Sequence, residues 1–311
     1  MSLISDTPFI DLYLGPDFTD VKGLNGRPGR VEAPESWEKD AQALREECLK
    51  HFELHQDPEF SLIQNGVILR VTQIGDAFGH TVFVIRKSNA QIRAFHMLGF
   101  PEDLVQSLLS ETTRGLVIFC GEIGTGKTSS GASLIVARLL ACGGIALAAE
   151  DPPETLLNGP HGAGRCIQMH VSRKTGGYEE ALIRGMRSGA DLMLIGEIRD
   201  TPAAVQVVRA AINGVFIVTT LHAGSPAQAI ERIATLAEPQ IRNAREILAQ
   251  GLIAVIAQSL EVQGGQRTLK IKSLSLTGPD GNGIREKIRT NQIAMIEQDV
   301  ENQSNRSLWA G

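Results

Sequence analysis

Residues 121–128, Gly-Glu-Ile-Gly-Thr-Gly-Lys-Thr, constrain the fold of this chain more than any other segment. An apolar run at 116–120 precedes them, and a helix-like segment at 129–141 follows. A glycine-rich loop between a strand and a helix turns backbone N–H groups inward around phosphates, and the helix N-terminus adds the positive end of its dipole. The segment therefore has the form and the setting of a Walker A loop, which predicts binding of a nucleoside triphosphate.

The side chains of this loop have distinct expected roles. Lys127 is expected to reach the β- and γ-phosphates, and Thr128 to offer its hydroxyl to Mg²⁺. Glycine is required where the backbone must approach the phosphates, because a side chain would block the approach. We predict nucleotide contacts from the whole segment: Gly121, Glu122, Ile123, Gly124, Thr125, Gly126, Lys127, Thr128 and Ser129.

Composition supports a globular protein. The chain has 311 residues, of which 42% are hydrophobic and 21% charged, and this length fits two domains. The net charge of −5 argues against a protein that mainly coats nucleic acid, which normally has a basic face. The four cysteines have no paired C-x-x-C spacing, which is typical of reduced, mostly buried cysteines. No stretch has the pattern of a signal peptide or a membrane span, so we expect a cytoplasmic protein.

Residues 1–95 are expected to form a small α+β domain. Short strand-like runs accompany one charged segment with a helical pattern. The expected elements are a strand at 11–14, a helix at 36–54, and a hairpin with strands at 67–71 and 81–85 around 75–79. The polar residues 87–91 would serve as a hinge to the second domain, 96–311.

Residues 96–311 alternate between strand and helix patterns. Short apolar runs are separated by helical stretches, which indicates a buried parallel sheet and an α/β fold. The expected strands lie at 116–120, 145–149, 192–195 and 215–220. The functional loops then belong at the carboxyl ends of these strands. A further apolar tract, 252–257, is too short to cross a bilayer and is predicted to be a buried helix.

Acidic residues follow two of these strands. Glu197 comes directly after one of them, and a carboxylate at the end of a dry strand near the phosphate loop can hold Mg²⁺-bound water or polarise the attacking water. Arg199, two residues further, is a second catalytic candidate. Glu150 begins the run Glu-Asp-Pro-Pro-Glu, in which the prolines fix the backbone. Glu150 or Asp151 is therefore expected to support Mg²⁺ and its water shell, with Thr128 and Glu197 as the other metal candidates. A turn with incidental acids is the alternative.

Histidine and arginine residues complete the set of candidates. His222 follows the strand at 215–220 and could sense the γ-phosphate or orient water, although an isolated histidine is more often structural. Arg184 and Arg187 are three residues apart on one predicted helix face and suit contacts with phosphate or with a neighbouring subunit, surface charge being the alternative. A zinc site is not expected, because the spacing of His161, Cys166 and His170 fits no zinc pattern.

Taken in order, four motifs resemble those of the secretion ATPase superfamily, which powers type II secretion, type IV pili and type IV secretion. The motifs are Walker A at 121–128, an acidic Asp box at 150–154, a Walker B region at 194–200 and a His box at 220–222, and the resemblance covers roughly 11–297. The chain is most similar to type IV pilus retraction, or twitching motility, ATPases, because 245–260 and 283–289 resemble that group's C-terminal helices.

The chain also departs from the patterns of these groups. It lacks the tetracysteine zinc module of the assembly and type II secretion enzymes. Met169 and Ala223 stand where retraction enzymes usually have Arg and Thr. The run His-Ala-Gly-Ser-Pro at 222–226 is instead familiar from conjugative type IV secretion ATPases. The residues therefore indicate the superfamily more strongly than the particular machine.

The resemblance implies a PAS-like N-terminal domain, a RecA-like P-loop ATPase domain, and a homo-hexameric ring on the cytoplasmic side of a bacterial inner membrane. It implies ATP hydrolysis with Mg²⁺, in which Glu197 is the general base, Glu150 assists Mg²⁺ and water, and His222 couples the γ-phosphate to domain movement. Arginines of the N-terminal domain complete sites in this family, and Arg70 and Arg86 are the candidates here. The implied partner is an inner-membrane platform protein of a pilus or secretion machine, through which the ring would associate peripherally with the membrane.

Two other functions remain open. A nucleic-acid translocase would share the RecA-like core, but the acidic balance and the Asp and His boxes favour the secretion motor, and we expect no direct contact with nucleic acid. A ring component that binds ATP without hydrolysing it is the second alternative. The intact Lys127, Thr128 and Glu197 argue against it.

Overall fold

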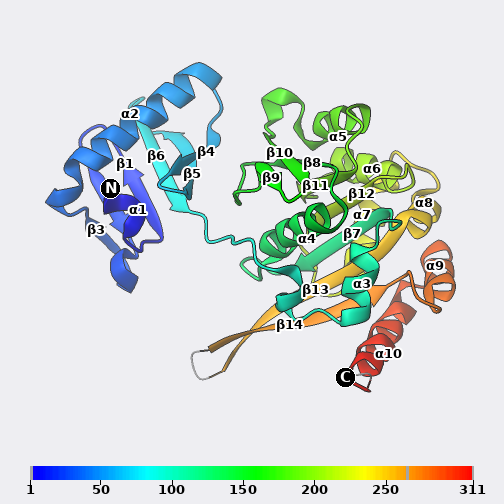
Figure 1. Cartoon of the computed structure of the whole chain (residues 1–311). Helices are drawn as coiled ribbons and strands as arrows, with labels where there is room; N and C mark the ends of the chain where they lie inside the picture. Colours follow the sequence, from blue (N-terminus) through cyan, green and yellow to red (C-terminus); the bar gives the residue numbers. More distant parts are fainter. Residues whose placement is uncertain (1–2, 264–265, 310–311) are drawn as a thin grey trace. The chain divides into compact units, whose positions relative to one another are not determined.

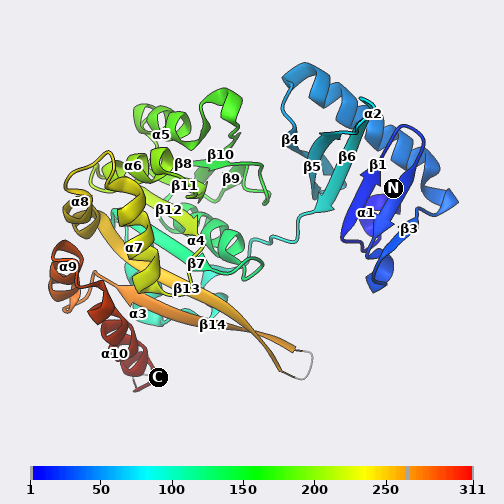
Figure 2. The same cartoon turned by 180° about the vertical axis from the view of Figure 1, so that it is seen from behind.

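The computed structural model describes residues 3–263 and 266–309, and the chain divides into two compact units. Unit 1 is Met1–Asn89 together with the short segments Asp151–Leu156 and Ser172–Lys174. Unit 2 is Ala90–Glu150, Leu157–Val171 and Thr175–Gly311. Figures 1 and 2 show the elements of both units from opposite sides.

Unit 1 is an antiparallel sheet packed against a long helix, α2 (Glu38–His55) (Figure 1). The sheet order is β3-β2-β1-β6-β5-β4. The helix buries Ala41, Leu44 and Cys48, whose spacing places them on one face. The expected strand at 11–14, the helix and the hairpin are all present. The remaining elements are α1 (Leu3–Asp6), β1 (Asp11–Leu14), β2 (Thr19–Lys22), β3 (Arg30–Glu32), β4 (Glu59–Gln64), β5 (Val67–Gly75) and β6 (Thr81–Lys87).

Unit 2 is built on a mixed eight-stranded sheet in the order β14-β13-β7-β12-β11-β8-β10-β9. Neighbours from β13 to β10 are parallel, whereas β14 and β9 pair antiparallel at the two edges. The four strands expected from the sequence are β7, β8, β11 and β12. The bounds are β7 (Gly115–Gly121), β8 (Ile145–Glu150), β9 (Gly159–His161), β10 (Gly164–His170), β11 (Leu192–Glu197), β12 (Phe216–Leu221), β13 (Leu252–Gln263) and β14 (Gln266–Ser275).

Helices cover both faces of this sheet. Along β7 the side chains of Leu116 and Ile118 enter one core, and those of Val117 and Phe119 enter the other. Both faces are therefore buried, which explains the continuous apolar runs. The helices α3 (Glu102–Leu109) and α4 (Lys127–Cys142) pack on one face. The other face is covered by α5 (Gly177–Arg187), α6 (Thr201–Ala210), α7 (Pro226–Ala237), α8 (Ala244–Gly251), α9 (Gly281–Arg289) and α10 (Ile296–Trp309).

The prediction of a buried helix at 252–257 is wrong. These residues begin β13, which runs parallel to β7 and continues into an antiparallel hairpin with β14. A short apolar run is compatible with either a buried helix or a central strand, because its periodicity does not separate the two. The β-branched Ile253, Val255 and Ile256 favour the strand.

The helix-like segment expected at 129–141 after the Walker A loop lies within α4. Among the residues that the structure describes, none of the helices combines the length and the apolar character that a bilayer span requires.

Candidate functional site

The loop between β7 and α4 depends on glycine for its shape. Gly121 has a φ of 150°, and a Cβ there would lie 2.2 Å from the carbonyl oxygen of Gln258 on β13. Gly124 and Gly126 also have positive φ values, of 79° and 91°, and a Cβ at either position would project into open space. Gly126 caps the N-terminus of α4. Such a loop leaves room for an anion at the positive end of the helix dipole.

Lys127 closes this loop on itself. Its Nζ donates to the carbonyl oxygens of Gly121 and Glu122, over 2.9 and 2.8 Å. Thr125 Oγ1 also donates to the Glu122 carbonyl, over 2.9 Å, and Thr125 is buried. The ammonium group of Lys127 therefore lies within the loop, where loops of this kind bind phosphates.

The remaining residues of the predicted loop are accessible. Ile123 is 88% exposed. Thr128 and Ser129 lie half-buried in the first turn of α4, and Ser129 Oγ accepts a hydrogen bond from the Gln91 amide over 3.1 Å. The hydroxyl of Thr128 therefore comes from the first turn of the helix that the loop opens.

Strand pairing brings the predicted catalytic residues to the carboxyl end of the sheet. In the register of β12, Leu221 pairs with Cys120 on β7, and Thr220 pairs with Glu197 on β11. The strand β8, which ends at Glu150, lies on the far side of β11. Because these strands are parallel, the residues that follow their carboxyl ends lie at the same end of the sheet.

Glu197 ends β11 and is paired with its predicted neighbour. Its Oε2 accepts from Arg199 Nη2 over 2.8 Å and from Arg199 Nε over 3.0 Å. The hydroxyl of Thr220 donates to the carbonyl of Gly196 over 3.1 Å, which ties the end of β11 to β12. The two hydrogen bonds from Arg199 hold the Glu197 carboxylate in a defined orientation at the end of β11.

Glu150 ends β8 in a buried position, with an exposure of 3%. Its Oε2 accepts a hydrogen bond from Gln168 Nε2 on β10. Burial, with a further contribution from Glu150, raises the pKa of the nearby Cys166 thiol to about 12. A carboxylate held in this way at the end of a strand is suited to orienting water or a cation.

His222 is placed directly beside the phosphate loop. Its Nε2 lies 3.3 Å from Oε2 of Glu122, the second residue of the Walker A segment. Its carbonyl oxygen accepts a hydrogen bond from Arg232 Nη1 on α7, over 3.0 Å. The structure therefore joins the His box to the Walker A loop by a side-chain contact.

Three of the other four predicted arginines have described ion-pair partners, and the partner of Arg70 is Glu154 of the Asp box. Arg184 and Arg187 are exposed on α5, and the ion pair that the structure describes for Arg184 goes to Glu180, at 2.8 Å. Within unit 1, Arg70 Nη1 lies 2.6 Å from Glu154 Oε1, and Arg86 Nη2 lies 2.7 Å from Asp11 Oδ1.

Sequence reasoning missed a buried polar pair behind the loop. Gln258 Nε2 on β13 donates to Ser130 Oγ on α4 over 2.8 Å, and Gln258 pairs in register with Gly121. Gln258 follows the apolar tract 252–257. A polar residue at the carboxyl end of a central strand is a candidate for the site. Interpreting 252–257 as a strand would therefore have identified Gln258.

The residues present fit a magnesium nucleotide. Among the described residues, no group of three or more His, Cys, Asp and Glu side chains could hold a metal ion by itself. Mg²⁺ in nucleotide sites is bound by one or two protein ligands together with phosphate oxygens and water. The open loop around Gly124 and Gly126 leaves space for phosphates, and Thr128, Glu150 and Glu197 carry side-chain oxygens of the kind that Mg²⁺ prefers.

A mainly parallel sheet with a glycine-rich phosphate loop after β7, joined to a small α+β N-terminal domain, defines a RecA-like P-loop protein. The family model described as "Type II/IV secretion system protein" matches residues 51–297. The chain belongs to this family.

Individual relatives extend over most of the chain. It is 27% identical over 300 residues to the type IV pilus retraction ATPase PilT of Pseudomonas aeruginosa. The matched segment covers 94% of this chain and 84% of PilT. It is 28% identical over 284 residues to the uncharacterized protein YggR of Escherichia coli, covering 87% of this chain and 83% of YggR.

Solved structures agree with this fold. The crystal structure of the pilus retraction motor PilT with bound ADP matches with a TM-score of 0.74 and 25% identity, covering 93% of this chain and 84% of that one. The Legionella pneumophila ATPase DotB matches with a TM-score of 0.71 at 16% identity, over 93% of this chain and 84% of DotB, which shows the shared fold.

Proposed function

We propose that this chain is a ring-forming motor ATPase that hydrolyses ATP to drive a type IV pilus or a related secretion machine. The observation that carries the proposal is the 3.3 Å contact between His222 and Glu122, which joins the His box to the Walker A loop at the carboxyl edge of the sheet. Glu197 and Glu150 end neighbouring strands at that edge. Similarity to PilT over 94% of the chain supports the pilus or secretion setting.

The residues then have separate roles in hydrolysis. Lys127 and the backbone N–H groups of the loop stabilise the charge on the β- and γ-phosphates. Glu197 takes a proton from the attacking water, while Arg199 holds that carboxylate in place through two hydrogen bonds. His222 senses the γ-phosphate. Thr128, Glu150 and Glu197 would hold Mg²⁺, which neutralises phosphate charge.

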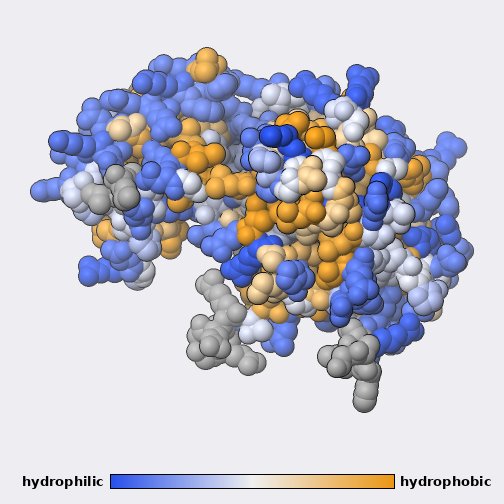
Figure 3. All heavy atoms as spheres, viewed as in Figure 1, coloured by the Kyte–Doolittle hydropathy of each residue, from blue (hydrophilic) through white to orange (hydrophobic). Residues whose placement is uncertain are grey.

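The proposed assembly is a homo-hexamer on the cytoplasmic side of the inner membrane, bound to a platform protein of the machine. The face of unit 2 in Figure 3 carries a broad hydrophobic area bordered by hydrophilic residues. Exposed hydrophobic residues of this unit include Leu140, Ile145 and Ile167. Apolar surface of this kind supports contacts with further chains. Arg184, Arg187, Arg70 and Arg86 are candidates for contacts with phosphate or between subunits.

The experiment that tests this function is ATPase activity across size-exclusion fractions with ATP and Mg²⁺. We expect activity in a hexamer-sized peak and a loss of at least about a hundredfold in Glu197→Gln, on the scale usual for a general base. Glu111→Gln, an exposed glutamate in a turn, is the matched control.

Other outcomes would favour the alternatives. Activity confined to a monomer peak would contradict the ring. Turnover that persists in Glu197→Gln would assign the base to another residue. ATP binding without turnover in every fraction would favour a silent ring component, and salt-sensitive stimulation by DNA would favour a nucleic-acid translocase.

A further inference from the structure

The loop that carries His222 is held by α7, the helix that follows it. The His222 carbonyl accepts from Arg232 Nη1 over 3.0 Å, and the Gly224 amide donates to Gln228 Oε1 over 3.0 Å. Ser225 caps α7, with its Oγ accepting from the Gln228 amide over 3.3 Å. The position of the backbone at 222–225 therefore depends on the position of the first turns of α7.

Ser225 also ties this loop to α10. Its hydroxyl donates to Oε1 of Glu297, which lies in the first turn of α10 and 72 residues further along the chain. On its other side, the carbonyl of Ser225 lies 3.7 Å from Cys120 Sγ, one residue before the Walker A segment. Burial is the main cause that raises the pKa of Cys120 to about 12, so this thiol is neutral and donates. Ser225 thus stands between the phosphate-loop strand and the C-terminal helix.

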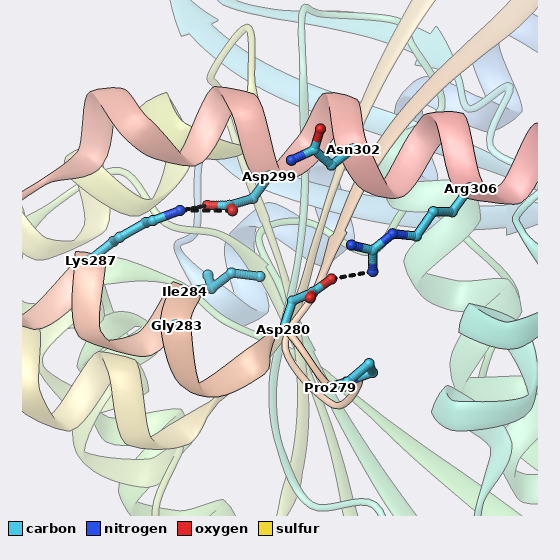
Figure 4. Close-up of a pocket in the computed structure, with 8 residues that line it drawn as sticks. All are labelled: Pro279, Asp280, Gly283, Ile284, Lys287, Asp299, Asn302 and Arg306. Carbon is cyan, nitrogen blue, oxygen red and sulfur yellow. Dashed lines mark hydrogen bonds and ion pairs between the residues drawn. The ribbon is translucent and has the colours of Figure 1, made fainter.

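The helix that supplies Glu297 is itself firmly anchored. Figure 4 shows α10 beside α9, with Lys287 directed at Asp299 and Arg306 at Asp280. Lys287 Nζ lies 2.7 Å from Asp299 Oδ2, and both side chains are largely buried. Gln303 accepts from the Ser275 amide and donates to the Ser275 carbonyl on β14, over 2.7 and 2.9 Å.

We propose that Glu297 is a positioning residue for His222. Through the Ser225 hydroxyl it holds the His box against the phosphate loop, so the rate of ATP turnover depends on the position of α10. A hydrogen bond to a carboxylate is stronger than one between neutral groups, which makes this contact the firmest of those that Ser225 makes. The inference rests on the proposed ATPase function and adds a site of control 72 residues away in the sequence.

The test compares Glu297→Ala and Glu297→Gln with Glu301→Ala, which removes an exposed glutamate one turn further along α10. Steady-state kinetics would give kcat and KM for ATP. The second measurement is the rate at which diethyl pyrocarbonate modifies His222 in nucleotide-free protein. Peptide mass spectrometry gives this rate relative to that of the exposed His55. It reports the environment of His222 and does not require ATP turnover.

We expect Glu297→Ala to lower kcat about tenfold while KM stays within about twofold, because small displacements of a catalytic group reduce the chemical step more than binding. The relative modification rate of His222 should change by about threefold or more. Glu297→Gln should retain most of the activity, since its amide oxygen still accepts from Ser225. Glu301→Ala should match the wild type in both measurements.

Wild-type kcat and wild-type His222 reactivity in Glu297→Ala would overturn the positioning role. If Glu197→Gln abolishes turnover while Glu297→Ala has no effect, only this inference fails. If the wild type hydrolyses no ATP, the proposed function fails, and the His222 modification rate still decides whether Glu297 positions the loop. Should Glu297→Ala not fold, Ser225→Asp removes the hydroxyl donor to Glu297 while keeping a side-chain acceptor for the Gln228 amide at the N-cap of α7, and it must give the same two changes.

Discussion

Gln258 and Ser130 connect β13 to α4 directly behind the phosphate loop: Gln258 Nε2 donates to Ser130 Oγ over 2.8 Å. The exposures of the two residues are 2% and 3%. Gln258 also approaches the loop through its backbone, since it pairs in register with Gly121. The loop is thus supported by a polar contact in the buried interior, where an unmatched polar group is costly.

This pair predicts strong non-additivity. Ser130→Ala alone leaves the Gln258 amide buried without its acceptor and should cost about 1–3 kcal/mol of unfolding free energy. Adding Gln258→Leu removes the stranded amide, so the double variant should lose less than the sum of the two single variants. Chemical denaturation followed by circular dichroism measures all three. Strictly additive losses would show that the hydrogen bond does not couple the two residues.

Two glycines should respond oppositely to alanine. Gly121→Ala places a Cβ 2.2 Å from the Gln258 carbonyl at a φ of 150°, and should abolish nucleotide binding or folding. Gly131→Ala lies inside α4, where the Cβ would meet Leu194 and Val218 at an ordinary 3.4 Å. It should raise stability by up to about 1 kcal/mol. Thermal unfolding and nucleotide titration compare the two, and equal behaviour would contradict the close approach of β13.

Lys127→Ala should abolish nucleotide binding. The ammonium group is the positive charge placed at the loop, where it now binds the carbonyls of Gly121 and Glu122. Titration with a fluorescent ATP analogue measures the affinity, and Lys270→Ala, at an exposed lysine of β14, is the control. Tight binding by Lys127→Ala would reject the Walker A assignment.

An ion-pair cluster between α7 and α8 predicts a pH dependence of stability. Arg245 binds both Glu231 and Glu238, each at 2.8 Å, and its hydrogen bond lowers the pKa of Glu231 below the ordinary value of 4.5. A carboxyl group with a depressed folded pKa contributes stability above its unfolded pKa, and this contribution is lost as the pH falls through the folded value.

Glu231→Gln should therefore destabilise the protein at pH 7 by less than about 1 kcal/mol, because the Glu231 side chain is 44% exposed. The difference from the wild type should shrink as the pH falls below the ordinary pKa of 4.5 and through the lower folded pKa, where the carboxyl is protonated. Urea midpoints at pH 7 and pH 3 measure it. A difference that grows in acid would mean that the pair does not hold Glu231 ionised.

Prediction from the sequence succeeded where one local pattern was enough. The strands at 116–120 and 192–195 are β7 and β11, because continuous apolar runs between polar loops are typical of strands buried on both faces. It failed at 252–257, where the same kind of run was assigned to a helix. Because of that error, Gln258 was not predicted as a site residue. Its place behind the phosphate loop depends on β13 pairing with β7.

The sequence by itself determined the phosphate loop and the alternation of strands and helices, because both depend on the chemistry and spacing of residues close together in the chain. Only the tertiary structure decided that β12 lies between β7 and β11, so that His222 meets Glu122. It also decided that Glu297 reaches Ser225 across 72 residues. The physical reason is that strand order and helix docking follow from the burial of both faces of one sheet, a property of the whole unit that no short window of residues contains.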